Sequence, residues 1–224
     1  IVCTDLSLGS SGSIDVDQKG YLDLEGPAPG ENTTVPGGAG HGGRGGGRGG
    51  AFGGVTYDSA TQPDEPGSGG GHNGNPGDRT YLSGGGVVKI EADDVLLNGM
   101  ITANGGDQAN SRHGGGAGGA IWIDCQTFDG TNGTVRANGG AGGSLGGGAG
   151  GGRIALDYTT MEPTCSVSLS ALAGGDGTGT ERNHGQLGTI SLPDATLLSS
   201  TLEFLNGRLL IPGFTSWSIA SLNM

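Results

Sequence analysis

Five acidic side chains beside apolar runs are the first candidates for chemistry. Polysaccharide-cleaving enzymes bring two carboxylates together at the scissile bond. Here the acidic residues do not recur at one position of the repeat described below. We therefore interpret them as solvated charge on an outer face, and we predict that the chain is not an enzyme. They are Glu91, Asp93, Asp94, Asp124 and Asp157.

Short catalytic motifs give no support for another reaction. The sequence has no His-Glu-x-x-His and no Cys-x-x-Cys, and neither lysine (Lys19, Lys89) follows a glycine as in a phosphate loop. Matches to Gly-x-Gly-x-x-Gly carry no weight, because glycine makes up 54 of the 224 residues.

Four histidines stand in four different glycine-rich stretches, where imidazole could bind a metal. We favour the simpler role, in which each ring fills space and hydrogen-bonds to bare backbone. Calcium is the one cofactor that the sequence suggests, since Gly174–Gly179 imitates a calcium-repeat nonapeptide once. Otherwise no cofactor is predicted. The histidines are His41, His72, His113 and His184.

Arg44 and Arg48 lie in an arginine-glycine stretch of the kind that binds single-stranded nucleic acid. The net charge of −12 argues against a polyanion partner. We expect both arginines to donate to carbonyls of neighbouring glycine segments, and we predict no nucleic-acid partner.

Three cysteines allow one disulfide and leave one thiol. Cys125 and Cys165 are about one repeat apart, so stacking favours that pair and leaves Cys3 for a neighbouring subunit; Cys3–Cys125 and Cys3–Cys165 remain alternatives. Asn32 and Asn132 begin N-glycosylation triplets.

The elements that carry these residues recur with a period of about 33 residues. A glycine followed by an alternating apolar strand begins at Gly86, Gly119 and Gly152, and more loosely at Gly188. A second strand ending in Ala-Asn-Gly-Gly closes at Gly106 and Gly140. We expect the Asn-Gly steps to supply the positive φ of tight turns. The side chains expected to point inward are Ile90, Ile101, Ile121, Ile123, Val135, Ile154 and Leu156.

This pattern predicts an all-β fold, a β-solenoid of about four coils. The glycine-rich stretches between strands have two interpretations: flexible loops, or polyproline-II segments packed alongside the coils. We favour the second, because Gly-Gly-x recurs in every repeat.

Residues 1–188 are predicted to form the glycine-rich module and residues 189–224 a C-terminal β cap or a segment joining subunits. Neither end shows a polar cap, so we expect residues 1–20 of one copy to contact residues 195–224 of the next. Their apolar side chains are the assembly candidates: Leu6, Leu8, Leu202, Phe204, Leu209, Ile211 and Trp217.

The order of motifs resembles a family of large glycine-rich secreted and cell-surface proteins of plants, protists and bacteria. The similarity lies in Gly20–Gly26, Gly40–Gly45, Pro66–Gly71, Leu97–Gly106 and Gly147–Asp157. It implies a structural or adhesive exterior protein without catalytic residues. The glycine stretches are also similar in composition to the polyproline-II bundle of springtail antifreeze protein.

Together these observations predict a structural subunit of an extracellular filament, appendage or matrix that polymerises head to tail. The alternative is an extracellular binding module for a glycan or for ice. No apolar run approaches the roughly 20 residues of a membrane span, so none is predicted.

Overall fold

The computed structural model describes residues 1–73, 82–108, 112–176, 183–198 and 205–214. Their regular elements are all β-strands, which alternate along the chain between two sheets. In chain order these are β1 (Val2–Leu8), β2 (Ser13–Asp15), β3 (Val87–Leu97), β4 (Met100–Thr102), β5 (Ala120–Asp129), β6 (Thr131–Arg136), β7 (Arg153–Met161), β8 (Ser166–Ser170), β9 (Thr189–Ser191), β10 (Leu205–Asn206) and β11 (Arg208–Leu210).

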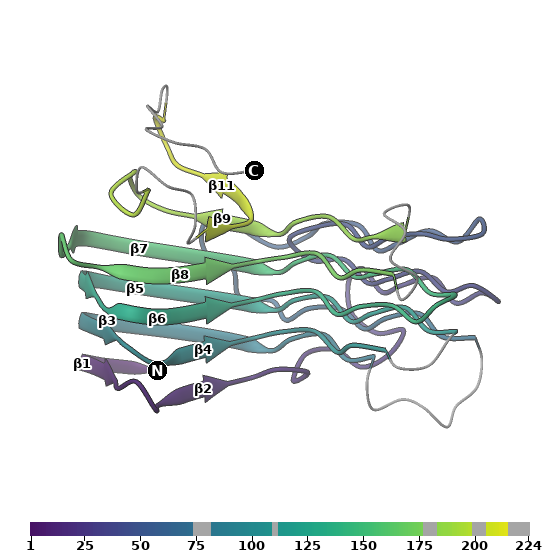
Figure 1. Ribbon diagram of the computed structural model, residues 1–224, viewed down its shortest axis with the longest axis horizontal. Coiled ribbons are helices and arrows are strands. Elements are labelled where there is room, and N and C mark those ends of the chain that lie inside the picture. The colour runs from purple at the N-terminus through teal and green to yellow at the C-terminus, as the bar shows by residue number, and fades with distance from the viewer. Residues whose placement is uncertain (74–81, 109–111, 177–182, 199–204, 215–224) are drawn as a thin grey trace.

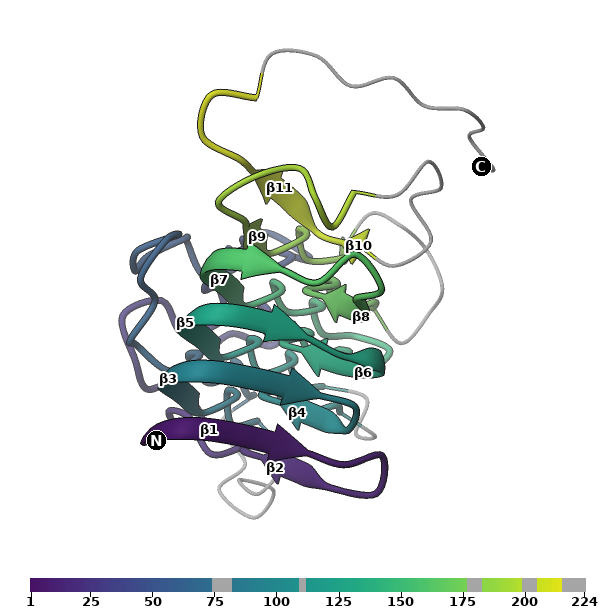
Figure 2. The same ribbon diagram turned by 90° about the vertical axis from the view of Figure 1, so that its left-hand side faces the viewer.

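The strands form two parallel sheets, and the prediction of a β-solenoid is wrong. Sheet A has the order β1-β3-β5-β7-β9-β11, and sheet B has the order β10-β8-β6-β4-β2. The sheets face each other, with β1 and β2 at one end of the stack and β10 and β11 at the other (Figure 2). The turns are unequal: residues 16–86 separate β2 from β3, whereas residues 103–119 separate β4 from β5.

The repeat predicted the strand register correctly but not the path between strands. Gln126 of β5 donates to Asp93 of β3, 33 residues earlier, across paired strands (3.0 Å, Nε2 to Oδ1). Such a spacing aligns parallel strands whatever route the chain takes to return. The length and direction of each return depend on contacts between glycine segments, which the period does not encode.

The core lies between the two sheets, where alternate side chains of each strand point inward. All seven side chains predicted to point inward are buried, and Ile121 and Ile154 of sheet A and Val135 of sheet B are fully so. Val88, Ile121 and Ile154 lie side by side in one row across β3, β5 and β7. This part of the prediction is confirmed.

Glycine-rich segments run out from one end of the strands and lie beside one another (Figure 1). We call them the glycine layer. Backbone hydrogen bonds join successive segments: Gly85 N donates to Ala117 O (2.9 Å), Gly118 N to Gly150 O (3.1 Å) and Gly151 N to Gln186 O (3.0 Å). These bonds satisfy backbone groups that burial would otherwise leave unpaired, so the described segments are packed and are not loose loops. They form no regular element, and the polyproline-II part of the prediction is not retained.

Candidate functional site

The most prominent surfaces of the fold are the two ends of its stacked sheets. Sheet A ends in β1 and β11, and sheet B ends in β2 and β10. Among the described residues each of these four strands has a partner on one side only. An open strand edge presents N–H and C=O groups that can pair with another chain.

Apolar side chains gather at both ends. Ile1 and Val2 are 55% and 81% exposed, and Leu210 and Phe214 are 42% and 43% exposed. Of the predicted assembly residues, Leu6, Leu8 and Ile211 are half-buried against the core and Leu209 is exposed. Leu202, Phe204 and Trp217 lie outside the described residues.

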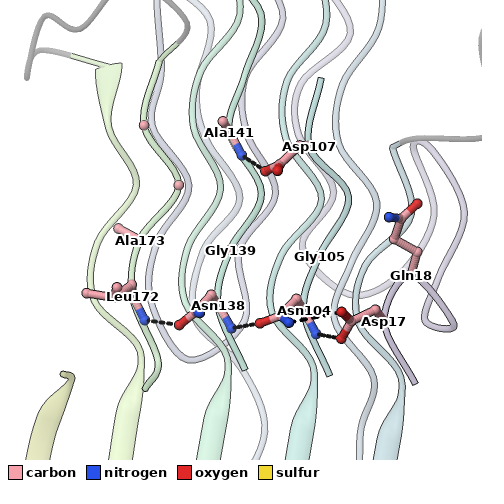
Figure 3. Close-up of a pocket in the computed structure, with 12 residues that line it drawn as sticks. Asp17, Gln18, Asn104, Gly105, Asp107, Asn138, Gly139, Ala141, Leu172 and Ala173 are labelled. Atoms are coloured by element: carbon pink, nitrogen blue, oxygen red, sulfur yellow. Dashed lines mark hydrogen bonds between the residues drawn. The ribbon is translucent and has the colours of Figure 1, made fainter. Parts of the chain in front are cut away.

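A ladder of polar side chains crosses the point where sheet B passes into the glycine layer (Figure 3). Asn104 N and Nδ2 donate to the two carboxylate oxygens of Asp17 (2.6 and 3.0 Å). Asn138 N donates to Asn104 Oδ1 (2.9 Å), and Leu172 N donates to Asn138 Oδ1 (2.8 Å). Each side chain therefore accepts a hydrogen bond from a backbone N–H in the segment that follows the next strand of sheet B.

The expectation that Asn-Gly steps supply a positive φ holds at Asn132 (φ 62°) but not at Asn104 or Asn138. In the described chain the positive-φ residues other than glycine are Gln18, Leu24, Asp58 and Asn132. Asn104 and Asn138 therefore act through their side-chain amides and not through left-handed backbone. The ladder borders a hollow of about 560 Å³ whose other walls include Asp107 and Leu172. Asp107 Oδ1 accepts a bond from Ala141 N there (2.7 Å).

The acidic residues of sheet A do share a register, contrary to the sequence interpretation. Glu91 pairs with Asp124, and Asp124 pairs with Asp157, across β3, β5 and β7. Lys89 forms an ion pair with Glu91 (2.7 Å) and lies over the ring of Trp122 (4.3 Å to its centroid). The hydrogen bond from Lys89 lowers the pKa of Glu91. The row borders a shallow hollow of about 370 Å³ on the outer face.

Three histidines of the glycine layer face aspartates, which sequence reasoning missed. His41 is fully buried; its Nδ1 bonds Gly118 O (2.7 Å), and its Nε2 faces Asp58 Oδ2 (3.2 Å). Burial acts to raise the pKa of Asp58, but hydrogen bonds from His41 and Ser59 outweigh it, so this pKa lies below its ordinary value. The bond to Gly118 O agrees with the backbone-binding role expected of these histidines.

Two other His–Asp pairs lie in the glycine layer. His72 lies 3.2 Å from Asp23 and His184 lies 3.7 Å from Asp176, while His113 pairs with His72 in an isolated bridge. Within the residues that the structure describes, no three His, Cys, Asp or Glu side chains are grouped as metal ligands. Of the calcium-like stretch Gly174–Gly179, residues 177–179 lie outside the described residues.

Two arginine side chains donate to backbone carbonyls of the segments between strands. Arg48 donates to the carbonyl of Ser144, as expected of it. Arg153, which sequence reasoning did not single out, is buried and donates through Nε to Tyr57 O (2.8 Å). Ser144 also stands in a Gly-x-Ser-x-Gly match, but its surroundings are a glycine segment and not the strand-to-helix turn of a nucleophile elbow.

All three cysteines are free thiols in the structure. Cys125 is buried and Cys165 is half-buried, both at the core, while Cys3 lies on the edge strand β1. Burial, with the neighbouring carboxylates of Asp124 and Asp157, raises the pKa of Cys125 to about 12. Burial also raises the pKa of Cys165.

We expect iodoacetamide at pH 8 to modify Cys3 in the folded protein and to spare Cys125, because the thiolate is the reactive form. Peptide mass spectrometry of the reduced protein with and without denaturant measures this, and the Cys125 thiol should react only after unfolding. The Cys125–Cys165 disulfide remains a prediction, which a separate digest of the non-reduced protein tests. A peptide joining Cys3 to Cys125 would contradict both the protection and the pairing.

Both glycosylation candidates are accessible. Asn32 is exposed in the first glycine-rich excursion, and Asn132 is exposed within β6 with a positive φ of 62°.

The fold and these surfaces define a protein of two parallel sheets with open ends and a hydrogen-bonded glycine layer. No family model matches the chain, and neither a curated protein nor a solved structure is significantly similar to it. None of the described residues forms a helix of the length and hydrophobicity needed to cross a bilayer.

Proposed function

We propose that the chain is a non-catalytic structural subunit of an extracellular filament, appendage or matrix, and that it assembles head to tail. The observation that carries this proposal is the pair of unlike open ends, each formed by parallel strand edges with exposed apolar side chains. Each edge of a parallel sheet presents both N–H and C=O groups, so the edge strands of one end can continue the parallel pairing at the other end of a second copy. A contact between unlike ends is heterologous and need not close, which generates a filament.

Several further features support an exterior structural role. The glycine layer is held by backbone bonds between segments distant in sequence, which gives a compact body from few apolar residues. The exposed asparagines of the two glycosylation triplets, Asn32 and Asn132, fit a secreted protein. The net charge of −12 disfavours nucleic acid as a partner.

A second candidate is a binding module for a glycan, which the groove beside the asparagine ladder favours. Amide and carboxylate groups of Asn138 and Asp107 border a hollow large enough for a small sugar. The groove lacks an aromatic platform among its lining residues, which makes this the weaker candidate.

Electron microscopy tests the filament directly. We expect the purified chain to form regular filaments at micromolar concentration, and a chain lacking residues 200–224 to form monomers or irregular aggregates. If the full chain stayed monomeric at all concentrations, the proposal would be wrong. Ordered filaments from the truncated chain would instead indicate lateral packing through the glycine layer.

A further inference from the structure

The carboxyl group of Asp58, which faces the buried ring of His41, is ionised. It accepts four hydrogen bonds and is surrounded by donors only, as a carboxylate requires. Burial acts to raise the pKa of Asp58, but the hydrogen bonds from His41 and Ser59 outweigh it and lower this pKa. The donors to Oδ1 are the backbone N–H groups of Ser59 (2.6 Å) and Asp64 (3.4 Å), and those to Oδ2 are His41 Nε2 (3.2 Å) and Glu65 N (3.3 Å).

The imidazole of His41 has an acceptor at each of its two nitrogens. Its Nε2 faces the Asp58 carboxylate, and its Nδ1 faces the carbonyl oxygen of Gly118 at 2.7 Å. Neither a carbonyl oxygen nor an ionised carboxylate can donate a hydrogen bond. Both ring nitrogens must therefore carry hydrogen, which is true only of the imidazolium ion. In neutral imidazole one nitrogen lone pair would face an oxygen, and the fully buried ring is shielded from solvent that could relieve the repulsion.

Other ionisable side chains surround the ring without serving as its acceptor. The ring of Tyr57 lies 4.7 Å from that of His41, and burial raises the pKa of Tyr57, so its hydroxyl is neutral. The nearby arginines donate to backbone carbonyls and, as cations, oppose a positive ring. Among the described carboxylates, Asp58 is the one bonded to His41, and it stabilises the charge. The charged side chains of the surrounding segments are Asp64, Glu65, Arg153 and Arg208.

The charged ring joins three parts of the glycine layer. His41 and Asp58 lie in the long connection between β2 and β3, whereas Gly118 lies just before β5. Two residues beyond His41, Gly43 N donates to Gly151 O (2.8 Å), so the same segment also reaches the connection before β7. Few apolar side chains hold these segments together. A lone pair forced against an oxygen at their meeting point would therefore weaken the packing of the layer.

We propose that His41 is a proton-dependent lock of the glycine layer. As imidazolium it holds residues 37–60 against the segment that precedes β5, and loss of its proton loosens this contact. The lock is a property of the single chain, so it does not depend on the proposed head-to-tail assembly.

The lock stabilises the protein on the acidic side of neutrality. Imidazole in an unfolded chain loses its second proton near pH 6.5, whereas the folded layer favours the protonated ring. The stabilisation is therefore complete below about pH 6.5 and decreases as the pH rises, by up to about tenfold in the unfolding equilibrium constant per pH unit. Asp58 sets the opposite limit. Because its pKa is lowered, its contribution is present above about pH 4 and is lost as the pH falls further.

Nuclear magnetic resonance of the full chain, labelled with ¹⁵N at histidine, tests the protonation state directly. Correlation of the ring nitrogens with the carbon-bound ring hydrogens distinguishes imidazolium from both neutral tautomers. The His41 ring is assigned through its contact with the ring of Tyr57. We expect it to be imidazolium at pH 7. A neutral ring at that pH would overturn the proposal.

Denaturant unfolding between pH 5.5 and 8.5 tests the consequence for stability. His41→Gln keeps a donor and an acceptor but cannot gain charge. We expect the unfolding constant of the wild type to rise with pH more steeply than that of His41→Gln, with a difference approaching tenfold per pH unit above about pH 6.5. Equal slopes for the two proteins would contradict the lock. If His41→Gln does not fold, the state of the wild-type ring at pH 7 decides.

His184→Gln is the matched control within the same layer. The His184 side chain is 36% exposed and lies 3.7 Å from Asp176, so its charge is better screened by solvent than that of His41. We expect this substitution to change the pH slope by less than about twofold per pH unit. A change as large as that of His41→Gln would mean that any histidine of the layer gives the effect, and would overturn the assignment to His41.

Discussion

Alanine at Gly148 is expected to destabilise the protein by about 3 kcal/mol or more, a fall in melting temperature of about 6 to 12 °C. A Cβ atom there would lie well under 3.0 Å from the carbonyl oxygens of Gly174 and Gly175. These are backbone atoms tied into the hydrogen bonds of the glycine layer, so they cannot turn aside as a side chain would. Gly118, which faces Ala137 O and Gly152 N equally closely, should behave alike.

Gly9→Ala is the matched control for the glycine layer. No atom lies within 4 Å of the position that its Cβ would take. We expect unchanged stability or a gain of up to about 1 kcal/mol, because alanine restricts the unfolded chain. Thermal unfolding followed by circular dichroism measures all three variants. Equal melting of Gly148→Ala, Gly118→Ala and the wild type would show that the segments pack less closely than described.

Truncating Ile121 to alanine is expected to lower the free energy of unfolding by about 2 to 5 kcal/mol. Ile121 is fully buried in β5, between Val88 of β3 and Ile154 of β7. Neighbours on both sides belong to paired strands, so the surroundings cannot collapse into the cavity without breaking register. Denaturant titration gives the free energy directly.

Thr159→Ala controls for the Ile121 measurement. Thr159 is exposed on β7, so replacing its side chain with alanine should change the free energy of unfolding by about 0.5 kcal/mol or less. If Ile121→Ala lowered the free energy of unfolding as little as Thr159→Ala, the two sheets would not be packed as described.

The buried His41–Asp58 pair shows how side-chain contacts select which glycine segments pack against one another. The imidazole joins the backbone of Gly118 to the carboxylate of Asp58, which in turn accepts from Ser59 N (2.6 Å). Three segments distant in sequence meet at one ring. Such a satisfied polar cluster fixes which glycine segments lie together, where glycine alone offers few distinguishing contacts.

The sequence by itself determined the strands of the repeat, the register of β3, β5 and β7, and the centre of the core. Alternating apolar residues repeated at about 33 residues mark which side chains point inward, as Ile121, Ile154 and Val135 show, because successive side chains of a strand point to opposite faces. The same spacing contained the acidic row of Glu91, Asp124 and Asp157, which an alignment of the repeats at 33 residues would have revealed.

Only the tertiary structure decided how the chain returns between strands and which carboxylate meets which histidine. A glycine segment has almost no side-chain information and can follow many extended paths at similar energy. Its path is selected by backbone hydrogen bonds with segments far away in sequence, such as Gly43 N with Gly151 O (2.8 Å).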